Sequence, residues 1–79
     1  MDSREMIRNF LLARFRSKIR GGALAFDAPL ISSGVIDSFG VLEVMAFLED
    51  TFAITIDPNA HEPAEFETVD SIAALVVRP

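Results

Sequence analysis

Cysteine, tryptophan and tyrosine are absent from this chain of 79 residues, and histidine occurs once, as His61. A chain without cysteine cannot form a disulfide, a thiolate zinc site or a cysteine nucleophile. One histidine does not make a metal site by itself, so we expect no bound metal.

Long apolar stretches are also missing. No apolar run approaches the roughly 20 residues of a membrane-spanning helix, and the first ten residues, MDSREMIRNF, mix charges of both signs. They contain no apolar signal region, so we expect a soluble, cytoplasmic protein without a membrane span. The length suits a single domain, 1–79, with one compact core and little room for a deep active-site cleft, so we do not expect an enzyme.

Basic residues are scarce in the second part of the chain. Residues 1–36 contain three acidic and six basic residues, whereas residues 37–79 contain nine acidic residues and one arginine. The second part should therefore attract basic partner surfaces and repel nucleic acid.

The spacing of the apolar residues predicts an all-α fold, a small bundle of three to four helices with a long first loop. Asp2 or Ser3 is expected to cap the first helix and Thr68 the last. The expected segments are helices over 3–18, 38–52 and 69–77, a short helical turn over 63–66, a long loop over 21–37 and an extended linker over 53–56.

The segment 38–52 is the longest amphipathic stretch. Phe39 and Phe47 fit either its inner or its outer side. Glu43, Glu49 and Asp50 fall mostly outside the apolar stripe, on a face that is either solvated or met by basic residues of a partner. The stripe itself consists of Val41, Leu42, Met45, Leu48 and Phe52, widened by Val44.

Ser38 stands where turn-forming residues give way to this helix, in the stretch GVIDSFGVLEVMAFLED. Asp37 and Ser38 are both favoured helix starters, because their side chains accept hydrogen bonds from free backbone amides. Capping alone would explain the pair.

The wider sequence offers a second interpretation. The stretches LISSGVIDSFGVLEVMAFLEDTF, AITIDP and FETVDSIAAL resemble the acyl carrier protein family. That family has an Asp-Ser-hydrophobic triplet at the start of its second helix, a glycine in the preceding loop and an acidic helix face. The matching residues are Asp37, Ser38, Phe39, Gly34, Phe52, Ile54, Ile56 and the pair Thr68-Val69.

The resemblance implies that a separate magnesium-dependent phosphopantetheinyl transferase attaches phosphopantetheine from coenzyme A to Ser38. The thiol at the end of this arm would then hold an acyl or aminoacyl group as a thioester. An acyl- or aminoacyl-loading ligase and a downstream synthase or transferase would be the further partners. Asp37, Phe39, Glu43, Glu49 and Asp50 are the candidate contacts with these partners, and we expect a stand-alone, monomeric carrier.

Two features depart from the carriers of fatty acid synthesis. Phe39-Gly40 follows the serine where those carriers have leucine and a polar residue, and the first helix is rich in arginine. The string Asp-Ser-Phe-Gly is similar to carriers of D-alanine, of other amino acids and of specialised biosynthesis. If most of Phe10, Phe15, Phe47, Phe52 and Phe66 point inward, they fill the space for a long acyl chain, so we expect a short or polar cargo.

Three other classes of function compete with a carrier. A hydrolase would need His61 within hydrogen-bond reach of Ser38, and the glycine pattern of a nucleophile elbow is incomplete here. A nucleic-acid reader could use Arg14, Arg16, Lys18 and Arg20, but these form two faces and the rest of the chain is acidic. A helical protein-interaction adaptor that never receives an arm would share the fold and the acidic face.

Overall fold

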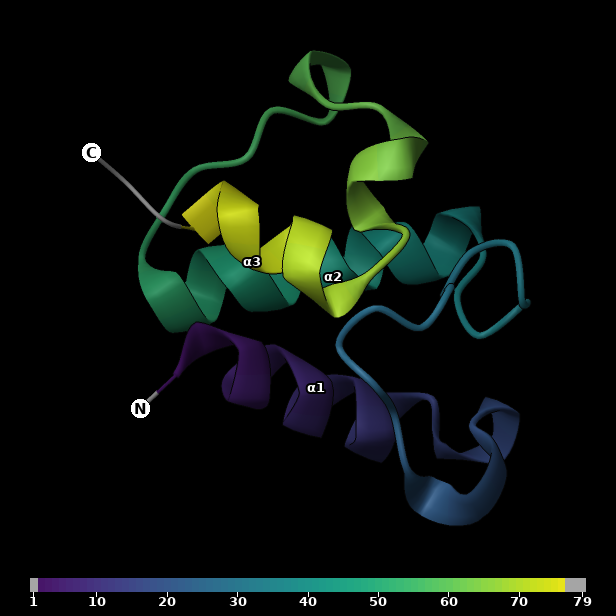
Figure 1. Cartoon of the computed structure of the whole chain (residues 1–79). Helices are drawn as coiled ribbons and strands as arrows, with labels where there is room; N and C mark the ends of the chain where they lie inside the picture. Colours follow the sequence, from purple (N-terminus) through teal and green to yellow (C-terminus); the bar gives the residue numbers. More distant parts are fainter. Residues whose placement is uncertain (1, 77–79) are drawn as a thin grey trace.

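The computed structural model describes residues 2–76, and all regular structure among them is helical (Figure 1). The prediction of an all-α fold is thereby confirmed. The elements are α1 (Ser3–Arg14), η1 (Arg16–Lys18), η2 (Arg20–Gly22), α2 (Ser38–Phe52), η3 (Pro58–Ala60), η4 (Pro63–Phe66) and α3 (Val69–Val76), where η marks a short 3₁₀ turn. No helix within residues 2–76 is both long and apolar enough to cross a membrane.

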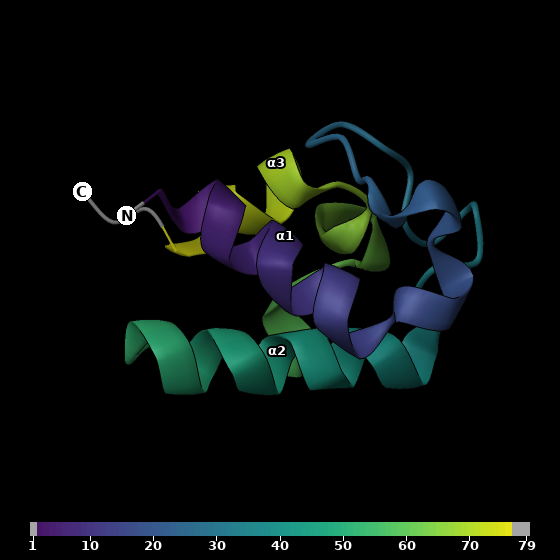
Figure 2. The ribbon, with the colours of Figure 1, turned by 90° about the horizontal axis from the view of Figure 1, so that it is seen from below.

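The helices α1 and α3 pack against each other, and α2 runs along one side of this pair (Figure 2). All three contribute fully buried side chains, including Leu11, Leu48 and Ile72. Removing such a side chain from water contributes about 1.5–3 kcal/mol each. The core as a whole consists of Ile7, Leu11, Ile19, Leu30, Val35, Ile36, Val41, Val44, Met45, Leu48, Ile56, Phe66, Val69, Ile72 and Ala73.

The first helix is shorter than predicted. It ends at Arg14 instead of residue 18, and the Phe15 N–H closes its last turn by donating to the Leu11 carbonyl at 2.9 Å. The chain then turns through η1, which allows Phe15 to reach α2 and Ile19 to enter the core. Tertiary packing therefore ends the helix where local helical preference would let it continue.

The second helix has the predicted bounds, but its buried face differs from the predicted stripe. Leu42 is 52% exposed, whereas Gly40 is buried together with Val41, Val44, Met45 and Leu48. Positions 41, 44, 45 and 48 follow the i, i+3, i+4, i+7 spacing of one helix face. Leu42 lies about 100° from Val41 around the axis, so it points out of the bundle.

The segments after α2 largely follow the prediction. Ala53 adopts a left-handed conformation that ends α2, and residues 53–56 form no strand in the described part of the chain. Thr68 caps α3 through a reciprocal pair of hydrogen bonds with Ser71, at 3.0 and 3.1 Å. The predicted last helix runs to 77, a residue that lies outside the described range.

Candidate functional site

Ser38 is the first residue of α2, and its side chain is exposed. Within residues 2–76, its hydroxyl forms no hydrogen bond, so it is free to react with an incoming group. Asp37 performs the capping, because its carboxylate accepts a hydrogen bond from the Gly40 N–H at 2.7 Å. Asp37 therefore caps the start of α2, and the Ser38 hydroxyl is not needed for capping.

Asp37 is held in its charged form. The hydrogen bond from the Gly40 amide is the main cause that lowers the pKa of this carboxyl group, and the positive charge of Lys18 lowers it further. A negative charge therefore stands directly beside the Ser38 hydroxyl at neutral pH. It also complements the positive end of the dipole of α2.

The loop before Ser38 is fixed by a glutamate from the far end of the chain. The Glu67 carboxylate accepts from the backbone N–H groups of Ile31 and Ser32 at 2.9 and 3.1 Å, and also from the Ser32 hydroxyl. The Glu67 carbonyl accepts from the Leu30 N–H at 2.7 Å. The Ser32 hydroxyl, followed by the two amides, lowers the pKa of Glu67. This contact spans 36 residues, so no local pattern in the sequence could reveal it.

Ser38 borders an open groove of about 330 Å³ between α2 and the segment η3–η4. Most of its lining is apolar. Of the polar lining residues, Asp37 and Ser38 lie on the α2 side, and His61 and Glu62 lie on the η3–η4 side. The lining residues are Ile31, Asp37, Ser38, Val41, Leu42, Met45, Pro58, His61, Glu62, Pro63 and Phe66. Leu42 was expected in the apolar stripe of α2 and instead lines this groove, and no sequence signal placed η3–η4 opposite it.

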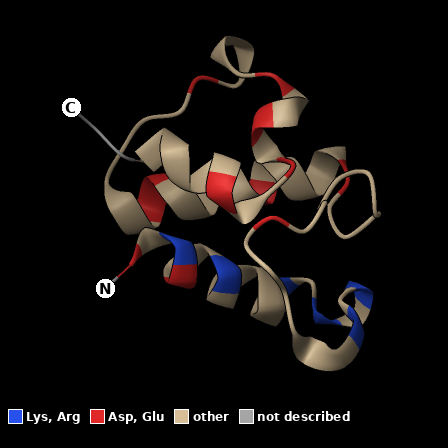
Figure 3. Cartoon of the chain, viewed as in Figure 1, with Lys and Arg blue, Asp and Glu red and all other residues tan. Residues whose placement is uncertain are grey.

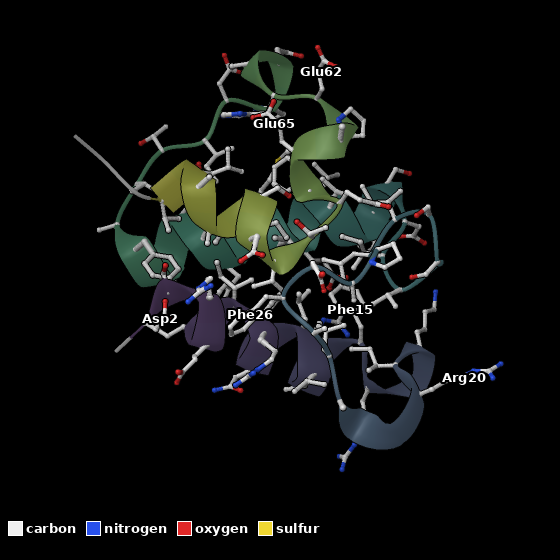
Figure 4. All side chains as sticks on the ribbon, viewed as in Figure 1. Asp2, Phe15, Arg20, Phe26, Glu62 and Glu65 are labelled. Atoms are coloured by element: carbon white, nitrogen blue, oxygen red, sulfur yellow. The ribbon has the colours of Figure 1, made fainter. Side chains whose placement is uncertain are left out.

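His61 lines this groove but is paired elsewhere. Its Nδ1 lies 3.0 Å from the Glu65 carboxylate, on the next 3₁₀ turn. Figure 4 shows the labelled Glu62 and Glu65 on the same segment, at the opposite side of the molecule from α1. A hydrolytic dyad would need a hydrogen bond between His61 and Ser38, and none exists among the described residues.

The candidate partner-contact residues fall into two groups. Phe39 is 67% exposed, and Asp37 and Asp50 are also exposed. Glu43 and Glu49 are half-buried and make contacts within the molecule. Glu43 pairs with Arg14 of α1, and Glu49 accepts a hydrogen bond from the Ile56 N–H at 2.8 Å. A partner role for any of these residues stays a prediction.

The charges form two regions on the ribbon (Figure 3). Basic residues follow α1 and gather at η1 and η2, whereas acidic residues lie mainly along α2 and the segments after it. Because η1 lies beside the start of α2, Ser38 stands near the boundary between the two regions (Figure 2).

Comparisons with known proteins agree with this arrangement. No family model matches the chain. D-alanyl carrier proteins from two strains of Streptococcus suis, 98HAH33 and 05ZYH33, are each 30% identical to it over 77 residues, which cover 98% of this chain and 94% of theirs. The solved structure of KstB-PCP in its apo form superposes with a TM-score of 0.77 at 35% identity, covering 98% of this chain and 85% of that one.

The chain thus matches D-alanyl carrier proteins over nearly its whole length and shares its fold with a second carrier, KstB-PCP. The chain belongs to the carrier protein family.

Proposed function

We propose that this protein is an acyl or aminoacyl carrier whose Ser38 is esterified with phosphopantetheine from coenzyme A. When bound, this group supplies a terminal thiol that a chain without cysteine lacks. The observation that carries the proposal is the exposed Ser38 hydroxyl at the first residue of α2, left without a hydrogen bond among the described residues because Asp37 caps the helix.

The surroundings of Ser38 fit such a group. The residue is exposed, so a transferase can reach it, and it borders a groove with a mostly apolar lining. A phosphodiester needs hydrogen-bond donors or positive charge nearby, and the start of α2 offers a favourable dipole. Glu67 and the buried Ile36 hold the preceding loop in place, so the serine is presented by a rigid frame.

The first experiment is modification by a broad-range phosphopantetheinyl transferase. The purified protein is incubated with coenzyme A and magnesium, weighed by mass spectrometry, and digested to find the modified peptide. We expect a gain of one phosphopantetheine, located on Ser38 and lost in Ser38→Ala. Ser33→Ala is the matched control, because Ser33 is also exposed but its hydroxyl donates to the backbone carbonyl of Pro29.

The unmodified adaptor is the alternative outcome of the same experiment. If the folded protein gains no mass while a known carrier is modified under the same conditions, the carrier proposal fails. The remaining function would be that of a helical interaction domain.

We propose that the carrier itself is not an enzyme, and that it acts as one cytoplasmic domain, 1–79, served by a transferase, a loading ligase and a downstream enzyme.

We further propose a short or polar cargo, with an amino acid such as D-alanine as the first candidate. Two observations support this choice: the relatives from Streptococcus suis are D-alanyl carriers, and one phenylalanine ring lies inside the core while others pack against it. Phe66 is fully buried, and Phe10 stacks on Phe47 with ring centroids 4.1 Å apart. Phe10, Phe15, Phe47 and Phe52 are half-buried and packed against the core around Phe66.

Two measurements test the cargo. The modified protein is offered a panel of amino acid and acyl donors with candidate ligases, and the thioester is identified by mass. Separately, acyl groups of increasing length are attached, and the hydrolysis rate of each thioester is measured. A long-chain thioester strongly protected from hydrolysis would contradict the proposal, because it would show that the bundle encloses the chain.

A further inference from the structure

The turn η1 is held against the first turn of α2. A Cβ atom added to Gly40 would lie 3.2 Å from the ring of Phe15, so the missing side chain lets the ring pack directly on α2. The Lys18 N–H donates to the Phe15 carbonyl at 2.9 Å, and the next residue, Ile19, is buried in the core. Lys18 is therefore fixed between two anchored residues, in the turn η1 that lies beside the start of α2 (Figure 2).

The other charged groups at this end are paired, have the wrong sign or lie elsewhere. Arg16 of η1 is also exposed, but it lines a separate hollow with Asn9 and Leu12 of α1, and Arg20 points away from the bundle (Figure 4). Arg14 is paired with Glu43, one turn further along α2 than Phe39. Asp37 and Glu62 are negative, and both line the groove that Ser38 borders, together with His61. Lys18 is exposed and forms no ion pair with any described residue. It is also the only lysine in the sequence.

A phosphodiester on Ser38 would add negative charge to a place that is already negative. The Asp37 carboxylate accepts from the Gly40 amide, which is a donor that an anion at the start of α2 would otherwise use. Two neighbouring negative charges repel, so a cation within reach is needed to stabilise the pair. The positive charge of Lys18 already acts on this end of α2, since it contributes to the lowered pKa of Asp37.

We propose that Lys18 is a binding residue for the phosphate group that Ser38 would carry, held in reach by the packing of Phe15 on Gly40. This inference rests on the proposed function for its biological meaning. A lysine suits the role because its ammonium is a compact charge on a flexible stem, and it can follow a phosphate without a fixed geometry. Such a contact would hold the root of the arm on the η1 side of α2.

The test observes the single lysine directly. The protein is prepared with lysine labelled by ¹³C and ¹⁵N, so that one side-chain spin system reports on Lys18, and spectra are compared before and after phosphopantetheinylation. We expect the Lys18 ammonium signal to shift on modification, because the added anion changes the electric field at this group. An unchanged signal in the fully modified protein would overturn the proposal. This measurement needs no substitution, so it does not depend on a variant that folds.

A second arm does not depend on any transferase. Phosphoserine is incorporated at position 38 during synthesis, and its second pKa, near 6 in free form, is measured by ³¹P NMR. We expect Lys18→Gln to raise this pKa by a few tenths of a unit or more, and Lys18→Arg to restore it. The difference in phosphoserine pKa between the wild type and Lys18→Gln should become smaller at high salt. Arg20→Gln is the matched control, because it removes the same charge from the neighbouring turn and Arg20 points away from the bundle (Figure 4).

The outcomes separate the two proposals. Equal titrations of the Lys18→Gln and Arg20→Gln proteins would reject the role of Lys18, whether or not coenzyme A modifies Ser38. Failure of coenzyme A modification with a positive phosphoserine result would reject the carrier proposal and leave an anion-binding lysine beside Ser38.

Discussion

Gly40 has no side chain, and this allows two segments to pack closely on the first turn of α2. An added Cβ atom would meet the Phe15 ring and the Ile36 Cβ atom, each at 3.2 Å. The absence of a side chain at Gly40 therefore allows Phe15, which follows α1, and Ile36, in the loop before Ser38, to pack on the same turn of α2. This explains the Phe-Gly pair after the serine in terms of packing.

The first prediction concerns side-chain size at this position. Alanine in place of Gly40 gains helix propensity of up to ~1 kcal/mol, but crowding against Phe15 opposes it, so we expect Gly40→Ala to leave stability nearly unchanged. Gly40→Val should destabilise the protein by about 1–3 kcal/mol through overpacking. Urea unfolding measures both values. Ala46→Val, at an exposed position of the same helix, should cost only about 0.5 kcal/mol; an equal cost at both positions would contradict the packing argument.

Phe39 and Leu42 form an exposed apolar pair beside Ser38. They stand three residues apart on α2, so they share one face, and they are 67% and 52% exposed. Large apolar groups exposed together often mark a protein-binding site. We therefore expect partner enzymes to contact them.

The second prediction follows from this exposure. Phe39→Ala and Leu42→Ala should each change the free energy of unfolding by no more than about 0.5 kcal/mol. Each should lower kcat/KM for modification of Ser38 by roughly fivefold or more, the loss expected for an interface residue worth over 1 kcal/mol. Thr51→Ala, exposed near the other end of α2, is the control. Rates unchanged from those of the Thr51→Ala protein would remove the pair from the interface.

At the scale of the elements, Glu67 fastens the loop before α2 to the segment before α3. The bonds from Ile31 and Ser32 favour the ionised carboxylate, because hydrogen bonds to a charged acceptor are stronger than those to a neutral one. Its pKa is lower in the folded protein than the ordinary value of 4.5. A depressed folded pKa means that the stabilisation is complete above the unfolded pKa and is lost as the pH falls through the folded pKa.

The third prediction is a pH dependence with this sign. The wild-type melting temperature should fall more steeply below pH 4.5, the ordinary value for glutamate, than that of Glu67→Gln. The variant should be less stable than the wild type at neutral pH and should approach it in acid. Asp50→Asn is the control, since Asp50 is exposed and its side chain forms no hydrogen bond with another described residue. Parallel melting curves for wild type and Glu67→Gln across the acid range would rule out this role.

The sequence predicted those elements whose signals are local. The start of α2 was predictable because Asp37 and Ser38 are cap formers directly before an apolar period, and Thr68 marked the start of α3 in the same way. The end of α1 was not, since it depends on where Phe15 finds Gly40, 25 positions away in the sequence numbering. Ser38 and exposed Phe39 were visible as candidates, whereas Leu42, Lys18 and Glu67 acquire their places only through packing between distant segments.

At the scale of the whole molecule, one small core supports three helices and the site. A domain of this size has little stability to spare, because a short chain buries a modest share of its surface. Fully buried side chains such as Leu48 therefore matter more than surface ion pairs such as Arg14–Glu43, which contribute about 0–1 kcal/mol.

The fourth prediction compares two leucines of α2. Leu48→Ala should cost about 2–5 kcal/mol, from lost burial and the cavity left behind. That amount is a large fraction of the roughly 5–15 kcal/mol typical of a native domain. Leu42→Ala is the matched control at 52% exposure. Chemical unfolding monitored by far-ultraviolet circular dichroism gives both values, and similar losses would show that Leu42 is part of the core.

The Glu67 fastening also has a consequence during protein synthesis. The residue lies in the last part of the chain, yet it fixes the loop that precedes Ser38. While the ribosome tunnel still covers Glu67, the emerging chain would show a transferase the serine without the loop contacts that position it. Attachment of the arm would then have to wait until Glu67 has left the tunnel and bound the loop.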